Sequence, residues 1–157
     1  MIVRRAASGD EKQLAALYSE MQRYYGSEDP PGGAARAAHM IAASQGHAPF
    51  ALVADRDGKL LGFANLSPIF YGGGYQWMLF LKDIYVAESA RFLGVGRVLM
   101  RGIAREALSS GYQRVDWTTD GTNHGAQALY DKTGIPRADK VFYRLGGEDL
   151  RALAEEA

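Results

Sequence analysis

The chain has 157 residues, a length typical of one domain, and its 47% apolar and 23% charged content is ordinary for a folded globular protein. Eighteen basic residues balance eighteen acidic ones, so the formal net charge is zero, which argues against a dedicated nucleic-acid-binding protein. Cysteine is absent, which excludes disulfides, thiolate metal sites and cysteine nucleophiles.

The sequence of the first half of the chain predicts two helices and four strands. Ser8 and Glu11 match a capping box, which predicts a helix with Ser8 as its N-cap. Its apolar residues follow at helical spacing until Gly26. After the break at residues 29–33, the alanine-rich stretch 34–44 predicts a second helix. The expected strands are residues 2–5, 50–54, 59–67 and 76–86, with an Asp-Gly hairpin turn between the second and third.

The second half alternates helices and strands. Its expected helices are residues 94–108, 123–132 (ended by Gly134) and 149–156, and its expected strands are residues 114–119 and 141–145. This order predicts an α/β fold in which a mixed sheet carries helices on both faces, with residues 1–157 forming a single domain.

No export signal or membrane span is evident. The N-terminus lacks an apolar stretch, and no apolar run reaches 18 residues. The three histidines show no metal-ligand spacing, so no metal is expected. We therefore expect a cytoplasmic protein without nucleic-acid or membrane partners.

The junction at residues 83–97 is the most informative segment. A strand ends there, small residues follow and a helix begins, so the free N–H groups and the dipole of the first helical turn suit an anion such as pyrophosphate. The dinucleotide fingerprint would need a glycine where Leu99 stands, and the Gly-Lys-Ser/Thr of a nucleoside-triphosphate loop is absent. The pattern present is Arg91-x-x-Gly94-x-Gly96, and Arg91 and Arg97 can add charge-assisted hydrogen bonds.

This pattern resembles the coenzyme A pyrophosphate loop of the GNAT acetyltransferases. Asn123, Ala126, Tyr130 and Gly134 further resemble the family's Asn-x-x-Ala-x-x-x-Tyr-x-x-x-Gly helix. The resemblance covers nearly the whole chain and implies the GNAT fold, with acetyl-coenzyme A as the cofactor.

Residues 80–86 narrow the resemblance to a subgroup. Their sequence, Phe-Leu-Lys-Asp-Ile-Tyr-Val, is similar to the Leu-Glu-Asp-aromatic strand of diamine and polyamine (thialysine-like) N-acetyltransferases, and Trp77 and Tyr143 have similar counterparts. Lys82 departs from the pattern, because those enzymes place a glutamate near the cationic substrate. A lysine there would repel a polyamine, so Lys82 either indicates an acceptor with a carboxylate, such as an amino acid, or points to solvent.

The resemblance implies direct acetyl transfer to a primary amine of a small molecule, such as a diamine, an amino acid or an aminoglycoside-like compound. Tyr130 is the expected general acid. Asp83 is the candidate for accepting the amine proton through water or holding the cation, and a purely structural carboxylate is the alternative. The expected cofactor contacts are Ile84, Tyr85, Val86, Arg91, Phe92, Leu93, Gly94, Val95, Gly96, Arg97, Asn123 and Tyr130. The expected substrate contacts are Tyr24, Trp77, Lys82 and Asp83.

Three other functions remain open. The acceptor can be a protein N-terminus or lysine, the protein can be a non-catalytic sensor that binds coenzyme A, or the motif can be a chance match in an unrelated interaction domain. A homodimer is expected from family analogy alone.

Overall fold

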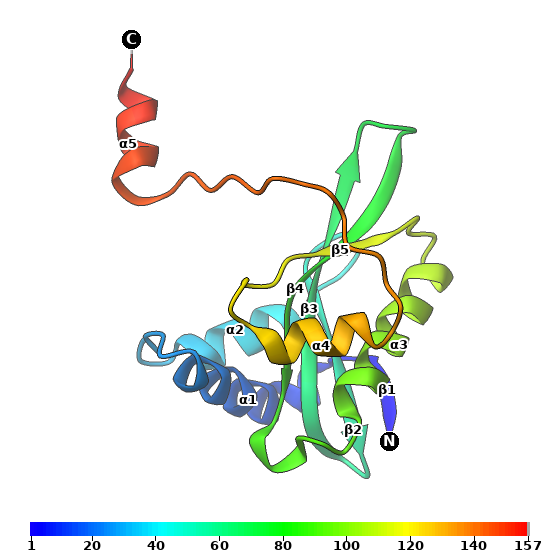
Figure 1. Cartoon of the computed structure of the whole chain (residues 1–157). Coiled ribbons are helices and arrows are strands. Elements are labelled where there is room, and N and C mark those ends of the chain that lie inside the picture. Colours follow the sequence, from blue (N-terminus) through cyan, green and yellow to red (C-terminus); the bar gives the residue numbers. More distant parts are fainter. Residues whose placement is uncertain (157) are drawn as a thin grey trace. The chain divides into compact units, whose positions relative to one another are not determined.

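The computed structural model describes residues 1–156, which form two compact units. The first unit, Met1–His124, contains the sheet and three α-helices (Figure 1). Its strands are β1 (Ile2–Arg5), β2 (Phe50–Arg56), β3 (Lys59–Tyr71), β4 (Gln76–Val86) and β5 (Val115–Trp117). Its helices are α1 (Glu11–Tyr24), α2 (Gly33–Ala42) and α3 (Val95–Ser109), with the 3-10 turns η1 (Ser8–Asp10) and η2 (Glu88–Ala90).

The five strands lie side by side in the order β1-β2-β3-β4-β5. The first four are antiparallel neighbours, whereas β5 runs parallel to β4 because α3 forms the crossover between them. The expected mixed sheet is therefore confirmed. The third strand is longer than expected, since β3 continues through Pro68 to Tyr71 in register with the start of β4.

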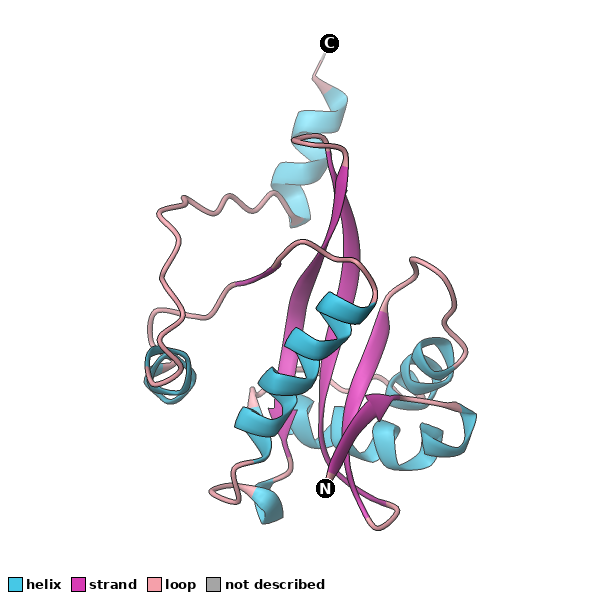
Figure 2. Ribbon diagram, turned by 90° about the vertical axis from the view of Figure 1, so that its right-hand side faces the viewer, coloured by secondary structure: helices cyan, strands magenta, loops and turns pink. Residues whose placement is uncertain are grey.

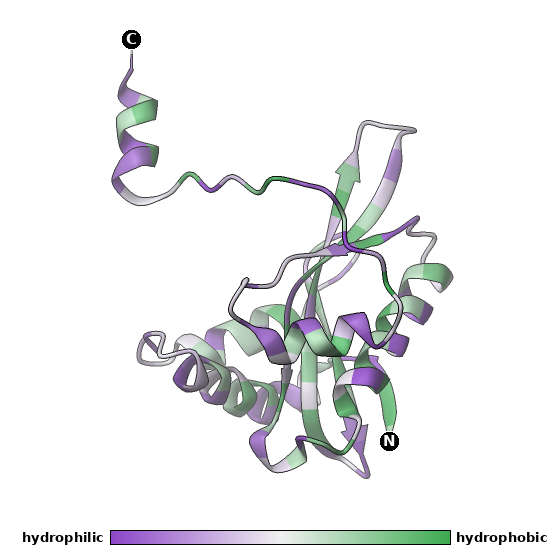
Figure 3. Ribbon diagram, in the orientation of Figure 1, coloured by the Kyte–Doolittle hydropathy of each residue, from purple (hydrophilic) through white to green (hydrophobic). Residues whose placement is uncertain are grey.

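Helices cover both faces of this sheet, as expected. Figure 2 shows α3 lying along one face, and Figure 3 shows that much of the sheet is hydrophobic. Successive residues of β2 and β3 alternate between the two faces. Val53 and Phe63 pack with Leu14 of α1, whereas Leu52 packs with Ile103 of α3. Each such buried side chain contributes about 1.5–3 kcal/mol to folding.

The start of α1 differs from the expected capping box. The helix begins at Glu11, and the group that reaches back is Asp10, whose Oδ2 accepts a 2.8 Å hydrogen bond from the Ala7 N–H. The same carboxylate binds the Arg4 guanidinium at 2.6 and 2.8 Å, and Arg4 also binds Asp55 of β2. The expected Ser8 cap is thus wrong, because Ser8 lies inside the 3-10 turn, which begins after Ala7, and α1 begins only at Glu11.

The second unit, which begins at Gly125, holds most of α4 (His124–Asp131) and all of α5 (Gly147–Glu155). The predicted end of the first of these helices is confirmed, since Gly134 adopts φ +71° shortly after it. The strand expected at residues 141–145 is wrong. That segment has no regular structure, Val141, Phe142 and Tyr143 are exposed, and within residues 1–156 no strand pairs with it. Its β-prone composition meets no neighbouring strand to bond its backbone.

Candidate functional site

The end of β4 lacks a neighbour on one side. Its pairing with β5 runs only from Leu79 to Leu81, whereas its pairing with β3 continues to Val86. Along residues 82–86 the side that β5 would occupy is therefore without a strand, in the part of the chain that the structure describes. The outward N–H and C=O groups there can bond an extended ligand as a further strand would.

The turn that follows β4 leads into the N-terminus of α3. Gly94 precedes the helix with φ +75°, and nothing lies within 4 Å of where its Cβ would be. A glycine offers no side chain to cap the helix, so the N–H groups of Val95, Gly96 and Arg97 remain for a ligand. These N–H groups and the helix dipole favour an anion at this end.

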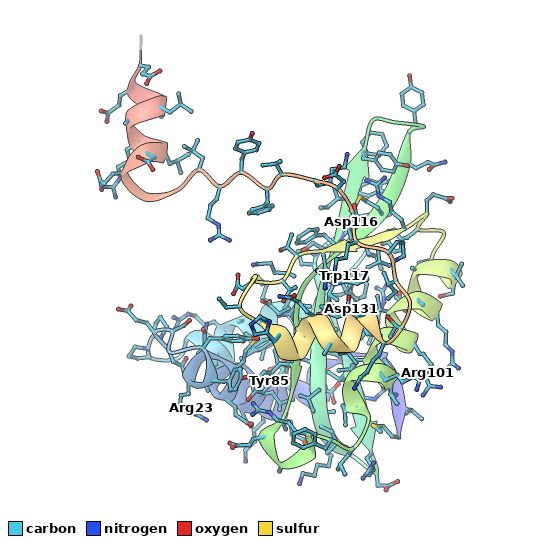
Figure 4. All side chains as sticks on the ribbon, viewed as in Figure 1. Arg23, Tyr85, Arg101, Asp116, Trp117 and Asp131 are labelled. Carbon is cyan, nitrogen blue, oxygen red and sulfur yellow. The ribbon has the colours of Figure 1, made fainter. Side chains whose placement is uncertain are left out.

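Contacts with α1 anchor this turn. Glu20 Oε1 accepts a 2.7 Å hydrogen bond from the Glu88 N–H and a 3.1 Å bond from the Tyr85 hydroxyl. The Arg91 guanidinium carbon lies 4.4 Å from the centre of the Tyr24 ring and 6.0 Å from that of Tyr85. Burial and the Glu20 carboxylate raise the pKa of Tyr85. Tyr85 is labelled in Figure 4.

A β-bulge at Lys82 changes which way β4 faces. Asn65 pairs with Asp83 and Leu66 pairs with Leu81, so Lys82 has no partner in β3. Before the bulge, Leu79 and Leu81 belong to the core under α3; after it, Tyr85 belongs to the core under α1 and α2. The extra residue thus reverses the alternation. It brings Asp83 to the α1 and α2 side, where Lys82 already points.

On that side lies a cavity of about 460 Å³ between α1, α2 and the strands β3 and β4. Lys82, Asp83 and Asp29 are its charged lining residues. Its other lining residues are Tyr18, Met21, Gln22, Pro30, Gly33, Ala34, Ala37, Met40, Ile41, Pro49, Asn65, Leu66 and Ser67. The wall is therefore mainly apolar, with opposite charges brought together where the bulge lies.

Asp83 is held by a chain of hydrogen bonds from α1. The Tyr18 hydroxyl donates to Asn65 Oδ1 at 2.8 Å, and Asn65 Nδ2 donates to Asp83 Oδ2 at 3.1 Å. Burial, together with the Asp83 charge, raises the pKa of Tyr18, so this phenol stays protonated as a donor. Burial also raises the pKa of Tyr25, whose hydroxyl is hydrogen-bonded by the Asn123 side chain.

Two of the expected substrate contacts, Trp77 and Tyr24, lie outside the cavity lining. Trp77, near the start of β4, stacks on His47 with ring centres 3.9 Å apart and packs at the α3 core, outside the cavity lining. Tyr24 supports Arg91 and does not line the cavity. Tyr130 lies in α4.

The sequence motifs did not identify Tyr18, Met21 or Asn65, because no fixed spacing marks them. Leu79 and Leu81 before Lys82 and Tyr85 after it face opposite sides of the sheet, and this change is visible only in the folded structure. In residues 1–156 no cluster of three or more metal-binding side chains occurs. None of the helices in that range is both long and apolar enough to span a bilayer.

Comparison with known proteins matches these features to a family. The profile of the acetyltransferase (GNAT) family matches residues 14–135. A D-amino-acid N-acetyltransferase from Saccharomyces cerevisiae is 30% identical over 94% of this chain and 91% of its own. A thialysine N-epsilon-acetyltransferase from Caenorhabditis elegans is 27% identical over 56% of this chain and 59% of its own. Among solved structures, an integron cassette protein from V. cholerae superimposes with a TM-score of 0.84 at 28% identity, covering 98% of this chain and 97% of that one.

Proposed function

The chain belongs to the GNAT family of acetyltransferases, and on that premise we propose that it transfers the acetyl group of acetyl-coenzyme A directly to the primary amine of a small molecule. Residues 1–157 act as one catalytic domain in this proposal. Direct transfer needs no covalent acyl-enzyme, which suits a chain without cysteine.

The observation that carries the proposal is that β4 connects the cavity to the glycine turn before α3. One end of its bulged segment, at Asp83, lines the cavity, and the other end leads into the glycine turn before α3. A molecule bound along the open side of residues 82–86 would have its anionic end at α3 and its other end beside the cavity. That is the arrangement a two-substrate transfer reaction needs.

The residues of the turn fit coenzyme A. The N–H groups of Val95, Gly96 and Arg97 suit the pyrophosphate, and Arg91 and Arg97 add positive charge. Main-chain groups of Ile84, Tyr85 and Val86 suit the amides of the pantetheine arm. Phe92 and Leu93 are exposed beside this turn, and Asn123 and Tyr130 are the remaining expected cofactor contacts. Acetyl-coenzyme A supplies the activated thioester.

The cavity fits a small acceptor. Its volume of about 460 Å³ lies in the range of small-molecule sites. The names of the yeast and nematode relatives, which specify a D-amino acid and thialysine, support a small amine as the acceptor.

Asp83 and Tyr130 handle the protons in this proposal. An alkyl ammonium with a pKa near that of lysine must lose a proton before it attacks, which costs about 4–5 kcal/mol at neutral pH. Asp83 holds this ammonium beside the cavity and accepts its proton through water. Tyr130 donates toward the leaving thiol sulfur; full transfer from a tyrosine to a thiolate is uphill by about 2 kcal/mol, so a strong hydrogen bond suffices.

The test is release of free thiol from acetyl-coenzyme A in the presence of diamines, amino acids, aminoglycosides and short peptides. We expect turnover with small amines and little with peptides. Coenzyme A binding without turnover on any amine would identify a sensor module instead, and absence of coenzyme A binding would contradict the proposal altogether.

A further inference from the structure

We infer that the acceptor is a free α-amino acid with an apolar side chain, whose carboxylate is bound by Lys82 and whose ammonium is held at Asp83. This inference rests on the proposed acetyltransferase function and assigns its substrate class. It makes Lys82 a specificity-determining residue.

The bulge is the first part of the argument. Neighbouring residues of a regular strand point to opposite faces, so they cannot both serve one ligand. Because Lys82 is the bulged residue, Lys82 and Asp83 both line the cavity. The fold therefore presents a cation and an anion from consecutive positions. A zwitterion, with its two opposite charges on one carbon, matches such a pair.

The second part is that Lys82 has no ion-pair partner among residues 1–156. Lys82 is exposed at the cavity wall, and none of the ion pairs within residues 1–156 involves it. Asp83, by contrast, is oriented by Asn65 through one carboxylate oxygen, Oδ2. We place the ammonium of the acceptor at the other carboxylate oxygen, Oδ1. A carboxylate would give the Lys82 ammonium a charge-assisted partner.

A diamine is the competing acceptor, since Asp29 and Asp83 both line the cavity. Lys82 adds a positive charge to the same lining, so a dication meets a repulsion that a zwitterion does not, which disfavours this alternative. The remaining wall is apolar, with Met21, Met40 and Ile41 among its members, and it suits a hydrocarbon side chain better than a second charge.

The experiment compares kcat/KM for leucine, as both enantiomers, with leucinamide, isoamylamine and putrescine. These probes share an amine and differ in the carboxylate and in a second charge. We expect the wild-type enzyme to prefer leucine. Lys82→Gln should lower the ratio of kcat/KM for leucine to that for isoamylamine by about 10- to 100-fold, the value of one hydrogen bond to a charged group. Because the readout is a ratio compared between variants, differences in amine pKa cancel.

Three further variants sharpen the test. Lys82→Arg keeps the positive charge and should retain most of the leucine preference, whereas Lys82→Glu should shift preference toward putrescine. Lys59→Gln removes another exposed lysine, at the start of β3 and outside the cavity lining, and should leave the ratio unchanged. Since Lys82 is itself exposed, its variants should fold, which circular dichroism checks.

The possible failures are distinguishable. A wild-type enzyme without preference for leucine, or a Lys82→Gln variant that slows all amines equally, would overturn this inference and leave the proposed function standing. No acetylation of any amine would overturn the proposed function and this inference with it.

Discussion

The Glu20 carboxylate of α1 accepts a 2.7 Å hydrogen bond from the N–H of Glu88, the first residue of the 3-10 turn that follows β4. The same oxygen accepts the Tyr85 hydroxyl at 3.1 Å. A single side chain of α1 therefore fixes both the end of β4 and the start of the turn that leads through Gly94 into α3.

Loosening this anchor should weaken coenzyme A binding. Glu20→Ala removes both hydrogen bonds, so we expect the dissociation constant measured by calorimetry to rise about 3- to 10-fold. Glu20→Gln keeps an acceptor oxygen and should retain most of the affinity. Equal affinity in wild type and Glu20→Ala would show that the turn is positioned without α1.

Arg91 and Arg97 should contribute to binding through their charge. Arg91→Ala and Arg97→Ala should each raise the dissociation constant of coenzyme A about 10-fold, and added salt should weaken wild-type binding. Arg101, labelled in Figure 4, is exposed one helical turn beyond Arg97 and provides the matched control. An equally large effect of Arg101→Ala would indicate that positive charge anywhere on α3 attracts coenzyme A, and that Arg91 and Arg97 do not form a defined site.

Tyr130→Phe should separate chemistry from binding. Removing the hydroxyl should lower kcat about 10-fold or more, while the dissociation constant of coenzyme A changes little. Single-turnover acetyl transfer measures the chemical step directly. A wild-type kcat in this variant would exclude the tyrosine from proton donation.

The Arg4 cluster predicts a pH-dependent stability. Hydrogen bonds from Arg4 lower the pKa of Asp10 and of Asp55, so this stabilisation is complete above the ordinary carboxyl pKa of about 4 and is lost as pH falls through the lowered values. Arg4→Met should lower the melting temperature by roughly 3–6 °C at neutral pH, and the difference should shrink below about pH 3.

An exposed ion pair provides the control for that measurement. Arg151 and Glu148 pair at 2.8 Å with side chains 74% and 86% exposed, so Arg151→Met should leave the melting temperature nearly unchanged. A difference between wild type and Arg4→Met that persists undiminished at acid pH would mean that Arg4 stabilises the fold through packing instead of charge.

The local sequence pattern was enough to predict much of this fold. Apolar, β-prone stretches and turn residues identified β1 to β4, and the glycines at 94 and 96 located the start of α3 to within one residue. The motif Arg91-x-x-Gly94-x-Gly96 was sufficient to predict the family, because anion binding at a helix start depends on the few residues that form it. Lys82 was also recognisable from the sequence, because it stands where the diamine and polyamine N-acetyltransferases have a glutamate.

What Lys82 does was decided by the tertiary structure. Whether a strand carries a bulge depends on its pairing with a neighbour, and only the register of β3 against β4 places Lys82 and Asp83 in one cavity. The hydrogen-bond chain from Tyr18 through Asn65 joins residues 47 positions apart, which no local pattern encodes. The strand expected at residues 141–145 was wrong for the same reason: β-propensity is local, whereas a strand exists only where a second strand bonds its backbone.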